Sequence, residues 1–85
     1  MKADKKTVMK KLNIASGQLE GIKRLIASDA YCLDISNQIL ATIALLKNAN
    51  LEILSAHLEH CIVDSSKEEL LTKINEINDL LKRIS

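Results

Sequence analysis

The stretch YCLDISNQILATIALLKNANLEILSAHLEHCIV, residues 31–63, decides the fold. Its apolar positions recur in steps of three, four or seven, and no glycine or proline interrupts them. This pattern predicts one long, unbroken helix. One face of that helix, which we call the central seam, consists of Cys32, Ile35, Ile39, Ile43, Leu46, Asn50, Ile53, His57 and Cys61.

Amphipathic segments on both sides of this stretch predict two further helices. The first shows an apolar stripe with alternating steps of four and three, and Ser28 and Asp29 follow it as a stop. Gly17 and Gly21 lie on this helix, where each glycine costs about 1 kcal/mol, so we expect another backbone to pass close to them. The stripe of the first helix consists of Val8, Leu12, Ala15, Leu19, Ile22 and Ile26, and that of the last consists of Leu70, Ile74, Ile77 and Leu81.

The composition agrees with an all-α fold of three helices. The chain has 85 residues, no proline, phenylalanine or tryptophan, and a single tyrosine. Such a chain holds one small domain, residues 1–85, and lacks the turn residues of a β fold. Three amphipathic helices of this size leave apolar stripes in water, so we expect the chain to form an oligomer.

Charge is distributed unevenly along the chain. Residues 1–27 carry seven basic and two acidic side chains, whereas the remainder carries five basic and nine acidic ones. A basic first helix, repeated in an oligomer, makes nucleic acid a plausible partner, and a solvated lysine face is the alternative. No apolar run follows the basic N-terminus and none approaches the length of a membrane span, so we expect a cytoplasmic protein with no membrane partner and reduced cysteines.

The motif HLEHC at residues 57–61 has the spacing of a metal site. His57 and Cys61 lie four residues apart, on one face of a helix. Cys32 shares the seam but lies 29 residues from Cys61, about 44 Å along a helix. An antiparallel dimer would bring Cys32 of one chain to His57 and Cys61 of the other. The alternative is a pair of small buried cysteines beside a hydrogen-bonded histidine.

Two thiolates and one imidazole form a soft, three-coordinate ligand set. This set suits Cu(I). Zinc prefers four ligands and would need His60 or a water molecule in addition. His60 lies about 60° from His57 around the helix, which makes it the weaker candidate.

Three motifs resemble the copper-sensitive operon repressor (CsoR) family of small all-α bacterial repressors. They are GQLEGIKR at 17–24, the YC pair at 31–32 and HLEHC at 57–61, and the resemblance extends over nearly the whole chain. It implies an antiparallel helical dimer that pairs into a tetramer and binds operator DNA when metal-free. It further implies that Cu(I) binds Cys32 of one subunit with His57 and Cys61 of the other and releases the DNA.

The resemblance also suggests roles for residues around the metal and the DNA. Tyr31 and Glu76 match the family's outer hydrogen-bonding partners of the metal-bound histidine. The family's basic residues before GQ and in the middle of the second helix are replaced here by Ile14, Ser16 and Asn48. DNA binding is therefore expected to depend on the remaining basic residues, Lys5, Lys6, Lys10, Lys11, Lys23, Arg24 and Lys47.

Within this resemblance the copper-sensing branch fits best. Nickel and cobalt sensors carry an additional histidine near the N-terminus, which this chain lacks, and persulfide sensors lose the histidine that stands here as His57. Two alternatives stay open. One is a thiol-based persulfide or electrophile sensor in which Cys32 and Cys61 of neighbouring subunits crosslink. The other is a metal-binding helical bundle with weak or no DNA binding. An enzyme is not expected, because the sequence has no glycine-rich phosphate loop.

Overall fold

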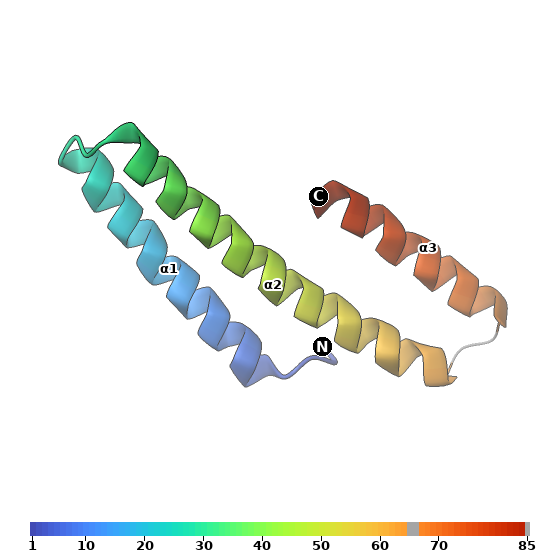
Figure 1. The fold of residues 1–85 in the computed structure, drawn as a ribbon. Helices are drawn as coiled ribbons and strands as arrows, with labels where there is room; N and C mark the ends of the chain where they lie inside the picture. Colours follow the sequence, from blue (N-terminus) through green and yellow to red (C-terminus); the bar gives the residue numbers. More distant parts are fainter. Residues whose placement is uncertain (65–66, 85) are drawn as a thin grey trace.

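The described residues form three helices (Figure 1). The computed structural model describes residues 1–64 and 67–84, and side chains at residues 1–59 and 68–83. Helix α1 comprises Lys5–Ala27, α2 comprises Cys32–Asp64 and α3 comprises Lys67–Ile84. The described residues contain no strand. The prediction of an all-α fold with one uninterrupted central helix is therefore confirmed.

Capping interactions explain where α1 begins and ends. Asp4 caps its start, because the carboxylate accepts hydrogen bonds from the Lys6 N–H (3.2 Å) and the Thr7 hydroxyl (2.6 Å). At its end, Asp29 adopts a left-handed conformation with φ of 53°. This residue donates its N–H to the Ile26 carbonyl (3.1 Å), and Ala30 donates to the Leu25 carbonyl (3.0 Å). This pair of bonds is the Schellman motif, and it turns the chain back so that α1 and α2 run antiparallel.

Small side chains hold α1 against α2. Val8, Ala15 and Ile22 of α1 are buried and recur every seven residues, while Thr42 and Ala49 are buried from α2. Alanine at two of these positions lets the helix axes approach closely.

Two polar contacts fix the alignment of α1 along α2. The Thr42 hydroxyl donates to Gln18 Oε1 (2.7 Å). Lys11 Nζ donates both to Asn48 Oδ1 (2.7 Å) and to Glu52 Oε2 (2.6 Å). Because the Lys11 and Glu52 side chains are only 26% and 29% exposed, this ion pair is partly shielded from water.

Helix α3 folds back along the C-terminal half of α2, on the side opposite α1 (Figure 1). Ile77 and Leu81 meet Leu54 and Leu58 of α2 around a shallow apolar groove. Within the described residues α1 and α3 do not contact each other. The three helices thus form one layer, which measures 55 × 26 × 12 Å between its Cα extremes.

A single layer leaves much of the chain in water. Its accessible surface is 6441 Å², whereas a compact monomer of 9.4 kDa exposes about 5,000 Å². The stripe predicted for α1 is split: its residues alternate between burial against α2 and exposure. The exposed members are Leu12, Leu19 and Ile26, at 41%, 51% and 55%.

These exposed α1 residues lie on the same side of the layer as the central seam of α2. At 100° per residue, both sets are rotated about 40–100° from the buried residues of the α1–α2 contact, in the same sense, and so point toward the same side of two antiparallel helices. On the seam, Ile39, Ile43 and Leu46 are 40–42% exposed. We call the surface formed by Leu12, Leu19, Ile26, Ile39, Ile43 and Leu46 the open apolar face.

The expectation for the two glycines is wrong within this chain. A Cβ at Gly17 would have no neighbour within 4 Å, and one at Gly21 would meet only Arg24 Nη2, at 3.7 Å. The reason is rotational: Gly17 lies on the face of α1 that points away from α2. No other part of the described chain approaches the helix there.

By length and composition, α2 could cross a membrane. The segment Cys32–Glu59 reaches a mean hydropathy of 1.3 in an 18-residue window, and 11% of that window is buried. Core helices of soluble proteins meet the same criterion. The ion pair of Glu52 with Lys11 and the exposed Lys47, Asn48 and Asn50 favour a core helix, since such groups are costly in lipid.

The left-handed residue predicts a stabilising substitution. Asp29→Gly removes the steric cost of a Cβ at positive φ and an acidic group from a helix C-terminus, offset in part by the greater freedom of glycine in the unfolded chain. We expect the free energy of unfolding to rise by roughly 0.5–1 kcal/mol. Urea unfolding followed by circular dichroism, at one fixed protein concentration, measures this change.

Asp29→Ala is the matched control. It removes the same charge but keeps a Cβ in the left-handed conformation, so we expect a clearly smaller gain in stability than for Asp29→Gly. Equal stabilisation by both substitutions would show that charge, and not backbone conformation, sets the cost at this turn.

Candidate metal centre and nucleic-acid interface

The predicted metal ligands lie at opposite ends of α2. Cys32 is the first residue of the helix and is exposed, and His57 is exposed near its C-terminal end. Cys61 lies in the last part of α2, but its side chain is outside the described residues. Because α2 is continuous, about 44 Å separates the two cysteines. Cys32 therefore cannot share a metal ion with Cys61 of its own chain.

No complete metal site is present in the described part of one chain. Among those residues, no three histidine, cysteine, aspartate or glutamate side chains come together in a way that could hold an ion. The HLEHC motif does lie on regular helix, which is the condition for residues four apart to share a face. His57 and Cys61 thus keep the backbone placement that their spacing predicts.

Tyr31 and Glu76, the expected hydrogen-bonding partners of the metal-bound histidine, lie near different ends of α2. Tyr31 precedes Cys32, is 66% exposed, and accepts the N–H groups of Asp34 (3.0 Å) and Ile35 (3.2 Å) at its carbonyl. Glu76 is exposed on α3. It is adjacent to Ile77, which lines a shallow groove together with Leu54 and Leu58, the α2 residues on either side of His57. Glu76 therefore lies at the level of His57, and Tyr31 lies beside Cys32.

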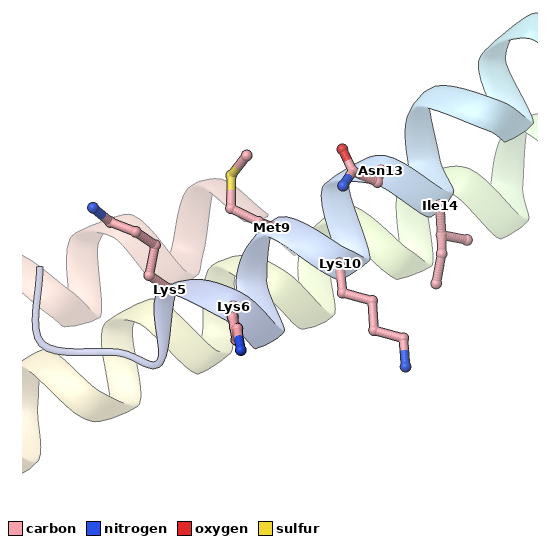
Figure 2. A pocket seen from close by; sticks show the side chains of 6 residues that line it. All are labelled: Lys5, Lys6, Met9, Lys10, Asn13 and Ile14. Atoms are coloured by element: carbon pink, nitrogen blue, oxygen red, sulfur yellow. The ribbon is translucent and has the colours of Figure 1, made fainter.

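Most of the predicted DNA-binding residues lie on the surface of α1. Lys5, Lys6 and Lys10 are exposed near its start, around a shallow hollow shared with Met9, Asn13 and Ile14 (Figure 2). Lys23 and Arg24 are exposed near its end, and Lys23 Nζ lies 3.4 Å from Glu20 Oε1. Lys47 is exposed on α2. The structure thus spreads the cations along α1, with one on α2.

Lys11 differs from the other predicted DNA-binding residues. Its ammonium group is held by Asn48 and Glu52 on α2, and its charge is balanced within the chain. Sequence analysis missed this arrangement because the two partners lie 37 and 41 residues further along the chain. Such a long-range pair leaves no local pattern, and only the alignment of α1 on α2 reveals it.

Comparison with known proteins assigns the family. A family model described as "Metal-sensitive transcriptional repressor" matches residues 4–83. The chain is 34% identical to the copper-sensing transcriptional repressor CsoR of Bacillus subtilis over 83 residues, which are 96% of this chain and 82% of that protein. It is 39% identical to the copper-sensing transcriptional repressor RicR of Mycobacterium tuberculosis over 59 residues, which are 69% of this chain and 62% of RicR.

A second mycobacterial relative gives the same result. The copper-sensing transcriptional repressor CsoR of Mycobacterium tuberculosis is 42% identical over 59 residues, which cover 69% of this chain and 50% of that protein. The matched part spans most of the Bacillus relative and only half or somewhat more of the mycobacterial ones. The chain belongs to the family of metal-sensitive transcriptional repressors. The expectation that it is not an enzyme is confirmed, because the family and these relatives are repressors.

Proposed function

We propose that the chain is a Cu(I)-responsive repressor whose metal site forms between two subunits. One observation carries the proposal: Cys32 and the HLEHC motif lie at opposite ends of one unbroken helix, α2. A single chain cannot complete the site, whereas two antiparallel copies of α2 complete it twice. The same pairing would cover the open apolar face.

The positions of the ligands also predict how the two copies align. If Cys32 of one copy lies opposite the His57–Cys61 pair of the other, the two-fold axis crosses α2 between Leu45 and Leu46. Leu46 is on the seam and 42% exposed in the single chain. Leu12, Leu19 and Ile26 flank this contact and would be buried with it. A tetramer built from two such dimers is part of the proposal.

The donor set fits Cu(I). Two thiolates and one imidazole form a soft, low-coordinate set, and the three relatives compared above are named as copper-sensing proteins. Tyr31 of one subunit would approach the site beside Cys32, and Glu76 of the other beside His57. These groups would orient the imidazole and connect the site to α3.

Operator DNA would bind the metal-free protein in the cytoplasm through the exposed cations of α1. Metallation would release it. The open alternative, a thiol sensor, uses the same two cysteines but does not require His57. A metal-binding helical bundle with weak or no DNA binding is the other alternative.

A mixing experiment tests whether the site is shared. Neither Cys32→Ala nor Cys61→Ala protein should bind Cu(I) with wild-type affinity. In a hybrid dimer, Cys32 from the second variant meets His57 and Cys61 from the first, so one of the two sites is complete. We expect high-affinity Cu(I) binding to return on mixing, at up to half a site per hybrid chain, measured by titration against a Cu(I) chelator.

Mixing two batches of the same variant is the control and should restore nothing. High affinity retained by either variant alone would exclude the shared site.

The proposed alignment predicts a specific crosslink. Leu46→Cys, in a chain that also carries Cys32→Ser and Cys61→Ser, should place two thiols near the two-fold axis, where oxidation forms a symmetric disulfide. We expect a covalent dimer on a non-reducing gel. Lys47→Cys in the same background is the matched control, because its side chain lies about 100° away around the helix. Equal crosslinking at both positions would contradict this alignment.

DNA release by Cu(I) is the functional test. The metal-free protein should retard fragments containing its operator, found by selecting genomic DNA, and one Cu(I) per subunit should abolish this shift. His57→Ala should keep the DNA shift and lose the Cu(I) response. If His57→Ala responds normally to persulfide, through a dimer crosslinked at Cys32 and Cys61, the thiol-sensor alternative replaces the copper proposal. If no fragment binds at low salt, the repressor mechanism fails.

A further inference from the structure

A polar hollow lies between α1 and the start of α2, at the end where the two helices join. It is lined by Gln18, Gly21, Arg24, Leu25, Ser28 and Gln38. No carboxylate is among these residues, and Arg24 carries the only formal charge. The hollow lies on the side of the layer opposite the open apolar face, because Gly21 and Leu25 occupy the opposite edge of α1 from Leu19 and Ile26. Pairing through the open apolar face therefore leaves the hollow accessible.

The groups around this hollow are hydrogen-bond donors. The Arg24 guanidinium makes no hydrogen bond or ion pair within the described part of the chain, and it lies over Gly21, with Nη2 3.7 Å from the Cβ position of that glycine. Gln18 Oε1 accepts the Thr42 hydroxyl, so its NH₂ group is the one left for the hollow. Across the hollow, the side-chain amide of Gln38 also has no partner among the described residues.

The α1–α2 groove does not offer an unpaired cation along its whole length. In its middle, Glu52 and Asn48 hold the Lys11 ammonium, and a phosphate there would have to compete with the Glu52 carboxylate at 2.6 Å. Nearer the turn, no acid contacts Arg24 within the described residues. Within the described residues, Arg24 therefore brings to its end of the groove a cation that makes no ion pair and can meet an anion.

We propose that Arg24, with the carboxamides of Gln18 and Gln38, forms an oxyanion site that takes a phosphate group. A guanidinium donates two parallel N–H bonds to a phosphate, and amide NH₂ groups add neutral donors around it. The ligand is a phosphodiester of the DNA backbone or free phosphate, which offer the same oxygens. The phosphodiester case depends on the function proposed above, and the free-phosphate case does not.

The experiment uses the full chain, metal-free, with two probes. A short DNA duplex of random sequence is titrated at several salt concentrations, and inorganic phosphate is titrated while NMR follows the Gly21 amide and the side-chain NH₂ signals of Gln18 and Gln38. Wild-type protein should show shifts of these signals with phosphate. Arg24→Gln should remove them and lower the duplex affinity about tenfold. The slope of log K against log salt should also fall by about 0.9 for each Arg24 that contacts the DNA.

Arg83→Gln is the matched control. It makes the same Arg-to-Gln change at an exposed position of α3, outside both the hollow and the predicted DNA-binding residues, and should change duplex affinity less than threefold. Gln38→Ala keeps all charges and should weaken phosphate binding severalfold. If Arg24 acted alone as a surface cation, this substitution would leave phosphate binding unchanged. Circular dichroism of each variant establishes that its helices are retained.

Each outcome either supports the oxyanion site or contradicts it. Loss of duplex affinity specific to Arg24→Gln and Gln38→Ala supports the site with DNA as its ligand. If phosphate shifts the NMR signals but the protein binds no DNA, the site is supported with free phosphate as its ligand. The proposal that the chain is a repressor is then contradicted. If Arg24→Gln behaves like Arg83→Gln toward both probes, or if Gln38→Ala has no effect on either, the oxyanion site is wrong.

Discussion

The length of one uninterrupted helix constrains everything else in this protein. Each residue of α2 advances the chain by 1.5 Å, so the two cysteines at its ends are held about 44 Å apart, whatever the other helices do. A shorter or kinked helix could have folded Cys32 back toward His57 and made a site within one chain. An unbroken α2 makes the site, if it forms, a property of the assembly. Metal binding and subunit pairing then become one equilibrium.

The same helix explains why the single chain buries few of its apolar residues. α1 packs on one side of α2 and α3 on the opposite side, which produces a layer and no enclosed core. The buried residues are few and mostly small, as at Ala15 and Ala49, while larger residues such as Leu19 and Ile39 stay in water. A stripe with coiled-coil spacing usually serves one partner. The stripe of α1 is divided between two surfaces, because its residues alternately pack against α2 and form part of the open apolar face.

The helices and the ligand spacing were predictable from sequence because both depend on short-range periodicity. A run without glycine or proline predicts α2, and the i, i+4 relation of His57 and Cys61 follows from any regular helix. The contact of Lys11 with Glu52 was not predictable, since it depends on how two helices align across 41 residues of chain. The glycine expectation failed for a related reason: sequence shows that a residue is small, and only the rotation of the helix shows what lies opposite it.

Helix α2 connects the open apolar face on one side of the layer to the hollow beside Arg24 on the other. The two surfaces would therefore influence each other through α2. Its seam carries the proposed metal ligands, and the side that faces α1 carries Thr42 and Glu52, which bond to Gln18 and Lys11 of α1. Interior packing resists gradual deformation, so a small rotation of α2 at the dimer contact would be passed to α1 through these bonds. Gln18 is placed to register such a rotation, because the amide that bonds Thr42 also lines the hollow beside Arg24. A change in pairing on one side of the layer would thereby alter anion contacts on the other.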